Sequence, residues 1–394
     1  MQRLYKAAIL AFLTTLLYVG CVSTQAQKLP KKLIEFGWDV PTPDFVQQNI
    51  KQMEKRPFDG IVIKLKGGKK VFLHEPYDSK EFTQDLQSLK STNFTKFTDN
   101  FVLMWATPDE GWDWFSDSDW QASEQNIRLF AGIARSAGFV GIAFDPEHYG
   151  VHPWKYVTLS GAKDKSFEEY WQQVRKRGAQ FMQALQEEIP DVKVLSLFQL
   201  SYLENFLDEA NLQKRMRQMS TESYGLLAAF LNGMLDVAQA NTRIVDGNEH
   251  SYYYAGRQEF LDTHKLIKER LLTFVDEKNR QKYAKQVQVG QAIYIDHLFD
   301  LGKAQESRVS HYLTPQQRQQ WLEHNTYHGL STSDEYVWCY SEEMNWWKNN
   351  VPSGAEEAIR SAQQKIKIGE PLGFNIEGTI RWAKMLQMTK NIIR

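Results

Sequence analysis

The chain has 394 residues, of which 42% are hydrophobic and 24% are charged. This composition is that of a globular protein with a sizeable core, and it excludes a disordered, collagen-like or coiled-coil chain. The 47 basic and 48 acidic residues nearly balance, so no overall basic surface for nucleic acid or an anionic membrane is expected. Twelve tryptophans favour either stacking on sugar rings or an aromatic-rich core.

The first 26 residues have the pattern of an export signal. Arg3 and Lys6 precede an uncharged apolar stretch over residues 7–19, which has the length of a signal-peptide core and is too short to span a bilayer comfortably. Cleavage after Ala26 would release a free chain, whereas Cys21 ends a lipobox-like pattern and would become a lipid anchor. We expect an exported protein that is periplasmic, secreted or an outer-membrane lipoprotein, with one domain over residues 31–394.

Cysteine usage fits this expectation. Only Cys21 and Cys339 are present, so a processed chain has no internal disulfide unless Cys21 is retained unmodified. There is no Cys-x-x-Cys motif and no His/Cys cluster, so no structural zinc site is expected.

Short apolar runs alternate with longer amphipathic stretches after the signal. Near-continuous apolar strands between amphipathic helices indicate parallel pairing with both faces of the sheet covered. We therefore predict an α/β fold, a single-domain (β/α)8 TIM barrel with decorated loops. A doubly wound open sheet is the alternative, but residues 66–69 lack the spacing of a nucleotide-binding loop. The predicted strands are residues 33–39, 60–65, 101–106, 140–145, 192–198, 242–246, 287–295 and 335–340.

Helical periodicity fills the segments between these strands. Pro43 and Pro315 are each placed to start a helix, and Gly138 and Pro190 are placed to end one. The other predicted helices cover residues 123–137, 166–188, 220–240 and 259–278.

Carboxylates follow several predicted strands, and in a (β/α)8 barrel the functional groups lie at the carboxyl ends of the strands. Asp145 and Glu147 follow the fourth strand, and Asp246 and Glu249 follow the sixth. Hydrolysis of a glycosidic bond requires such a pair, because one carboxyl protonates the leaving oxygen while the other attacks the anomeric carbon or activates water. We expect Glu147 and Glu249 to form the catalytic pair, with Asp145 and Asp246 tuning it or binding hydroxyls. Asp145 as the nucleophile remains an alternative.

Aromatic and polar side chains near the same strand ends are expected to bind the sugar. Aromatic rings stack on pyranose faces, while polar side chains contact hydroxyls. Asp296 could equally cap the seventh strand. Glu342, which follows the eighth strand, could equally cap the next helix. We expect a monomer that acts on carbohydrate without a cofactor or a metal. The expected substrate-binding residues are Trp38, Asp39, Trp105, His148, Tyr149, His250, Tyr252, Asp296, Trp338, Glu342 and Trp346.

Residues 144–149, 335–342 and 345–347, together with the opening segments 37–39 and 57–60, resemble exported bacterial (β/α)8 glycoside hydrolases. The resemblance extends over nearly the whole processed chain and implies paired carboxylates that cleave a polysaccharide or oligosaccharide outside the cytoplasm. The chitinase spacing of acids on strand four is absent, and so is the Asn-Glu ending of the largest retaining clan. The identity of the nucleophile therefore stays open.

Two other classes of function compete with this interpretation. A metal-dependent barrel hydrolase, such as a deacetylase or phosphodiesterase, could use His148, His250 and His297, which follow strands four, six and seven. No H-x-H or HExxH spacing supports it. A non-catalytic glycan-binding lipoprotein on a barrel is the other alternative, although a binder needs aromatic rings more than spare carboxylates.

A basic stretch, residues 64–70, follows the second strand and contains four lysines. It is either a solvated loop or an anionic subsite, since lysine contacts sulfate and carboxylate groups as a point charge. The second interpretation predicts a sulfated or uronic polysaccharide as the substrate.

Overall fold

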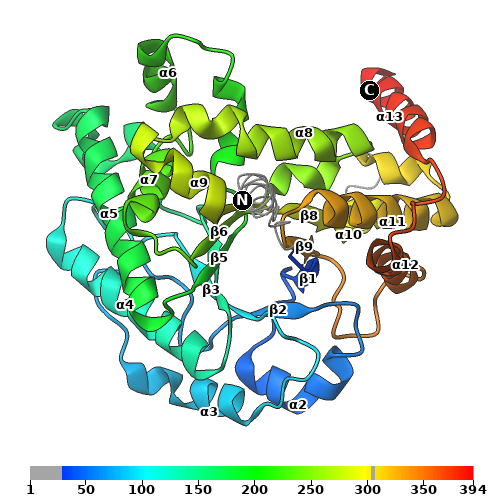
Figure 1. Cartoon of the computed structure of the whole chain (residues 1–394), viewed down its shortest axis with the longest axis horizontal. Coiled ribbons are helices and arrows are strands. Elements are labelled where there is room, and N and C mark those ends of the chain that lie inside the picture. Colours follow the sequence, from blue (N-terminus) through cyan, green and yellow to red (C-terminus); the bar gives the residue numbers. More distant parts are fainter. Residues whose placement is uncertain (1–28, 303–306, 394) are drawn as a thin grey trace, which may run out of the picture. The chain divides into compact units, whose positions relative to one another are not determined.

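All strand pairs in the structure are parallel, and the strands follow the spatial order β7-β6-β5-β4-β3-β2-β1-β9-β8. Figure 1 shows them at the centre with the helices around them. The apolar runs of the sequence form these strands, and nearly every strand residue is buried. The strands are β1 Lys32–Glu35, β2 Gly60–Ile63, β3 Phe101–Trp105, β4 Gly141–Asp145, β5 Lys193–Ser196, β6 Arg243–Asp246, β7 Val287–Val289, β8 Gln291–Tyr294 and β9 Tyr336–Tyr340.

This structure is a computed structural model that describes residues 29–302 and 307–393. Residues Lys31–Arg394 form one compact unit. A second unit, Met1–Pro30, falls almost wholly outside the described residues. The predicted export signal and Cys21 therefore lie outside the part of the chain that can be described.

The seventh predicted strand brings the two ends of the sheet together. Its first part, β7, pairs with β6, and its second part, β8, pairs with β9; only Gly290 separates them. The Gly290 amide donates to the Asp246 carbonyl at 2.8 Å, and a Cβ at this position would lie 2.9 Å from Val245. The result is a nearly closed barrel of parallel strands, which confirms the predicted α/β fold and TIM-barrel architecture.

Helices follow the strands as the periodicity predicts. Pro43 begins α2, and Ser166 caps α5 through a capping box with Glu169. None of the helices in the described residues is long and apolar enough to cross a lipid bilayer. The helices are α2 Pro43–Met53, α3 Thr83–Ser91, α4 Asp117–Ser136, α5 Phe167–Glu188, α6 Leu212–Met219, α7 Leu227–Val237, α8 Arg257–Lys268, α9 Arg280–Gln286, α10 Ile295–Phe299, α11 Pro315–Thr332, α12 Ala355–Ile368 and α13 Glu377–Ile393.

Two predicted helices, over residues 220–240 and 259–278, are shorter in the structure. The first is reduced to α7 because a turn precedes it, in which a Cβ on Gly225 would lie 1.9 Å from the Met219 carbonyl oxygen. The second ends at Lys268, and a 3₁₀ helix follows it. A close backbone contact within the turn overrides the helical periodicity in the first case, and bonds to a distant helix override it in the second.

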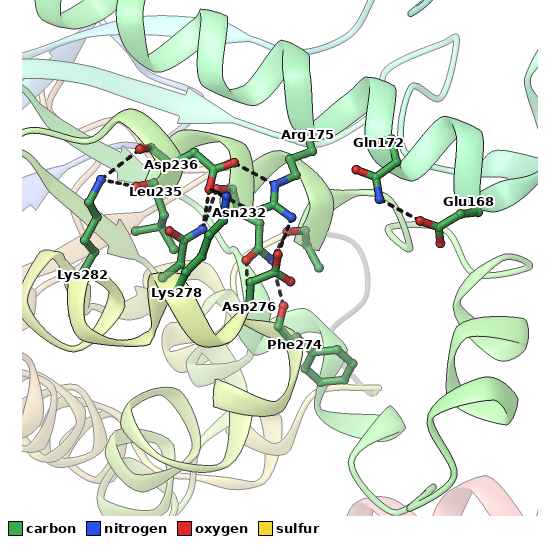
Figure 2. A network of polar contacts seen from close by, with 12 residues as sticks. Glu168, Gln172, Arg175, Asn232, Leu235, Asp236, Phe274, Asp276, Lys278 and Lys282 are labelled. Atoms are coloured by element: carbon green, nitrogen blue, oxygen red, sulfur yellow. Dashed lines mark hydrogen bonds and ion pairs between the residues drawn. The ribbon is translucent and has the colours of Figure 1, made fainter.

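A polar network fixes the chain beyond α8 to helices α5 and α7 (Figure 2). Arg175 donates two hydrogen bonds to the Asp236 carboxylate, at 2.7 and 3.0 Å, and also contacts Asp276. The Asn232 side chain donates to the Phe274 carbonyl and accepts from the Asp276 amide, both at 2.9 Å. These bonds satisfy backbone groups that a longer α8 would otherwise have paired within the helix.

Most tryptophans belong to the core. Their abundance is therefore better explained by an aromatic-rich core than by stacking on sugar rings. Trp112, Trp114, Trp120 and Trp154 are buried around Phe72, with ring centroids 5.0 to 6.4 Å from it. The aromatic loop after β3 therefore packs inward. Few tryptophan rings remain accessible to a ligand, and two of these are described next.

Candidate active site

A cavity of about 130 Å³ opens at the carboxyl ends of the barrel strands. This exceeds by far the volume that a single water molecule requires. Trp105 and Asp145 are the last residues of β3 and β4, and Lys64, Leu197 and Glu249 follow β2, β5 and β6. The cavity therefore lies where TIM barrels position their catalytic groups.

Two acids at the end of β4 share one tyrosine. Asp145 is buried, and its carboxylate accepts from the Glu147 amide at 2.9 Å. The Tyr149 hydroxyl lies 3.0 Å from Asp145 Oδ2 and 2.6 Å from Glu147 Oε2. Burial, followed by the nearby charge of Glu147, raises the pKa of Asp145 to about 8. The two carboxyls and Tyr149 thus form one hydrogen-bonded unit in the cavity wall.

The third acid, Glu249, begins the 3₁₀ helix Glu249–Tyr253 directly after a left-handed residue. Asn248 has φ 44° and ψ 64°, a conformation that asparagine tolerates better than most residues. Its side chain donates to Gln291 at 2.9 Å, which fixes the turn against β8. Burial, followed by the charges of Glu147 and Asp145, raises the pKa of Glu249 to about 8. Glu249 is therefore mostly protonated at neutral pH.

Aromatic side chains form much of the cavity wall. Trp38 is 64% exposed, which is unusual for so large an apolar side chain. Trp105 packs on Tyr149 with ring centroids 4.6 Å apart. Deeper in the cavity, the ring centroids of Tyr252 and Trp338 are 5.3 Å apart. The Trp338 indole N–H donates to the Gly247 carbonyl at 2.9 Å. Rings at both depths can contact a bound ligand.

Two of the predicted site acids point away from the cavity. Asp246 is fully buried, and its carboxylate accepts from the Gln199 and Ser201 amides and from the Ser201 hydroxyl. Asp39 accepts from the Trp346 amide at 2.7 Å and from the Ser341 hydroxyl at 3.2 Å. Both carboxylates hold the backbone of loops that surround the cavity, and neither lines it.

Three predicted substrate-binding residues that follow β8 or β9 also do not line the cavity. Asp296 accepts from the Glu342 amide at 2.5 Å and from the Met344 amide at 3.2 Å, which ties the loop after β9 to α10. Glu342 is exposed and accepts from the Tyr340 hydroxyl at 2.6 Å. Trp346 is buried, with its ring 4.9 Å from that of Phe58.

The histidines that follow the strands do not converge. His148 stacks on His152 with ring centroids 3.8 Å apart and contacts the Tyr224 hydroxyl. His250 is exposed near Tyr202, and His297 packs between Tyr253 and Trp321. Among the described residues, no group of three or more His, Cys, Asp or Glu side chains is placed to hold a metal ion. The geometry offers no support for the metal-dependent alternative.

One buried acid and several residues that line the cavity were not predicted. Glu35 is fully buried in β1, and its carboxylate accepts from the Gly37 amide at 3.0 Å. Burial, followed by the charge of Asp39, raises the pKa of Glu35 well above its usual value. An acid inside an apolar strand was the available signal. Phe36, Leu103, Leu197 and Tyr340 line the cavity, but apolar residues near strand ends cannot be told from core residues by sequence alone.

No protein-family model matches the chain, and no curated protein matches it in sequence. The fold and the cavity therefore define a class only: an α/β protein built as a TIM barrel, with carboxyl groups and aromatic rings around a cavity at the carboxyl end of its strands.

Proposed function

We propose that the protein is a glycoside hydrolase that cleaves an oligosaccharide or polysaccharide without a cofactor. The observation that supports this most strongly is the meeting of Asp145, Glu147 and Glu249 in one aromatic-walled cavity. Such acids supply the proton donor and the carboxylate that glycosidic cleavage requires, and the aromatic rings offer stacking surfaces for sugar. Action outside the cytoplasm, after export, is part of the same proposal.

The three acids of the cavity have different roles in the proposed reaction. Glu249, protonated near neutral pH because burial and the neighbouring acids raise its pKa to about 8, donates its proton to the leaving oxygen as the glycosidic C–O bond breaks. The unit formed by Asp145 and Glu147 retains negative charge, which Tyr149 stabilises by hydrogen bonding. One carboxylate of this unit attacks the anomeric carbon or removes a proton from the attacking water.

The test is reducing-sugar release by the purified chain across a panel of neutral, uronic and sulfated glycans. Glu147→Gln and Glu249→Gln should each lose at least about a thousandfold, which corresponds to roughly 4 kcal/mol of barrier. Glu222→Gln, which changes an exposed acid outside the cavity, is the matched control and should retain full activity.

Aryl glycosides with acidic leaving groups separate the roles of the two acids. Such a leaving group needs no protonation, so Glu249→Gln should recover most of its activity on these substrates, whereas Glu147→Gln should not. No release from any glycan would contradict the proposed function. Release that survives both substitutions would contradict the assignment of the catalytic pair.

A further inference from the structure

The structure divides the four lysines of residues 64–70 into two kinds. Lys66 pairs with Asp44 at 2.7 Å, and Lys70 pairs with Asp109 at 3.3 Å. Lys64 and Lys69 instead line the cavity. The Lys69 ammonium lies 3.6 Å from the centroid of the Trp105 ring. Two lysines of this basic stretch, Lys64 and Lys69, thus line the cavity. The other two, Lys66 and Lys70, form ion pairs with acids that do not line it.

The backbone holds these two lysines in place. The Lys64 amide donates to the Pro41 carbonyl at 3.0 Å. The Lys69 carbonyl accepts from the Trp105 amide at 2.8 Å, and Lys70 forms a parallel bridge with Trp105. Between them, the buried Asp85 accepts from the Lys66 and Gly67 amides at 2.7 and 3.3 Å. The segment is therefore anchored to the barrel, and its two cavity lysines are parts of the cavity wall.

Neither cavity lysine has an acidic partner within ion-pair distance in the described part of the chain. Burial, followed by the charges of Lys64 and Lys70, lowers the pKa of Lys69. An anion placed between the two ammonium groups would relieve this repulsion. A site for a neutral sugar has no need for two crowded cations.

The charge of the whole cavity agrees with this reasoning. Burial and neighbouring charges raise the pKa values of Asp145 and Glu249 to about 8, so both are largely neutral at pH 7. Glu147 shares the cavity lining with Lys64 and Lys69. A ligand that carries negative charge complements the two lysines of this lining.

We propose that the cavity binds a sugar that carries an anionic group, a uronic carboxylate or a sulfate ester, with Lys64 and Lys69 as its contacts. The Trp38 ring, which is 64% exposed in the wall of the same cavity, offers a stacking face for the sugar ring. This inference rests on the proposed function for the reaction, and it adds the substrate class.

The experiment compares each anionic glycan with its own neutral derivative. A uronic polymer is assayed before and after carboxyl reduction, and a sulfated polymer before and after desulfation. The chain should prefer one anionic form, and this identifies the anion. Lys64→Gln and Lys69→Gln should raise KM for that form about 10- to 100-fold with little change in kcat, and should raise KM for the neutral derivative much less. Raising the salt concentration should weaken binding of the anionic form in the original chain.

Lys66→Gln and Lys70→Gln are the matched controls, because they remove the same charge from the same segment outside the cavity. They should retain the original KM. Melting temperatures of all four variants verify that each one folds.

Calorimetry with short uronic and sulfated oligosaccharides separates this inference from the proposed function. Binding that depends on Lys64 and Lys69, in the absence of any hydrolysis, would support the anionic site and contradict the glycosidase. Cleavage of neutral glycans in preference to anionic ones would support the glycosidase and overturn the anionic site. Equal losses on charged and neutral substrates in the cavity variants would also overturn it.

Discussion

Tyr149 links the two acids of β4 through one hydroxyl group, which can donate its proton to only one carboxylate oxygen at a time. The shorter contact, 2.6 Å, is to Glu147, and the longer one, 3.0 Å, is to Asp145. A hydrogen bond to an ionised carboxylate favours the charged form. In the proposed mechanism, Tyr149 is therefore a positioning residue that stabilises the negative charge of the unit formed by Asp145 and Glu147.

Replacing Tyr149 by Phe should consequently raise the pKa of the carboxylate that must be ionised for catalysis. A hydrogen bond to a charged group contributes about 1.5–3 kcal/mol, so the acidic limb of the pH–rate profile should move up by about one to two pH units. Activity at pH 6 should fall more than activity at pH 8. Tyr156→Phe is the control, since its hydroxyl bonds to the backbone carbonyls of Ala162 and Lys165 outside the cavity lining. An unchanged acidic limb in Tyr149→Phe would show that this hydrogen bond does not set the ionisation.

Glu249, the proposed proton donor, should also destabilise the folded protein as the pH rises. Its pKa is raised to about 8 in the folded protein by burial and neighbouring acids, whereas an unfolded glutamate ionises near pH 4.3. The folded state therefore binds more protons than the unfolded state between these values, and stability falls as pH rises through this window.

Glu249→Gln removes the ionisation and should therefore stabilise the protein at pH 8 but hardly at pH 4.5. A gain of the order of 1–3 kcal/mol is expected, which is below the full shift because the side chain is only partly buried. Denaturant titrations at the two pH values measure the gain, with Glu222→Gln as the exposed control. A gain of equal size at both pH values would point to packing rather than to ionisation.

At the scale of elements, α5 and α7 approach each other closely through two glycines. A Cβ on Gly178 would lie 2.1 Å from the Phe230 carbonyl oxygen, and one on Gly233 would lie 1.9 Å from the Arg175 carbonyl oxygen. Both distances are to backbone atoms, so the helices would have to separate. The polar network around Arg175 and Asp236 opposes that separation (Figure 2).

Gly178→Ala and Gly233→Ala should each destabilise the protein by about 1–3 kcal/mol or more, although alanine is the better helix former. Gly132→Ala in α4 is the matched control, because its Cβ would meet only the end of the Glu188 side chain at 3.4 Å. That substitution should stabilise by up to about 1 kcal/mol. Thermal melts of the three variants decide the matter: if all three shift in the same direction, close helix packing is not the cause.

The elements also show how far sequence reasoning reaches. The strands were predictable because a buried parallel strand is a short apolar run. The position of Asp145, Glu147 and Glu249 at the carboxyl end of the barrel was predictable because they follow such runs. Asp246 could not be separated from them by the same rule. Its oxygens are occupied by Gln199 and Ser201, which come from the preceding βα loop, and no local pattern reveals such a contact.

At the scale of the whole molecule, buried histidines and buried carboxyl groups have opposite effects on how the free energy of unfolding changes with pH. Burial lowers the pKa values of His152, His297 and His328 to about 3, 4 and 4, and it also lowers that of His324. These histidines stay neutral in the folded protein but become protonated in the unfolded chain below pH 6.5, so acid destabilises the fold. The buried carboxyls act in the opposite sense, because their pKa values are raised.

The two effects oppose each other between pH 5 and 6.5, where both kinds of group differ in protonation between the folded and unfolded states. Above pH 6.5 the histidine contribution fades, whereas Asp145 and Glu249 remain more protonated in the folded state up to about pH 8, and the raised pKa of Glu35 acts in the same direction. We therefore expect maximal stability near pH 6 and a decline of the order of 1–3 kcal/mol per pH unit towards pH 8. Denaturant titrations from pH 5 to 9 at constant ionic strength measure this profile. The double variant Asp145→Asn/Glu249→Gln should flatten only the alkaline side, whereas a decline that survives this variant unchanged would have to originate elsewhere, with the buried Glu35 as the next group to replace.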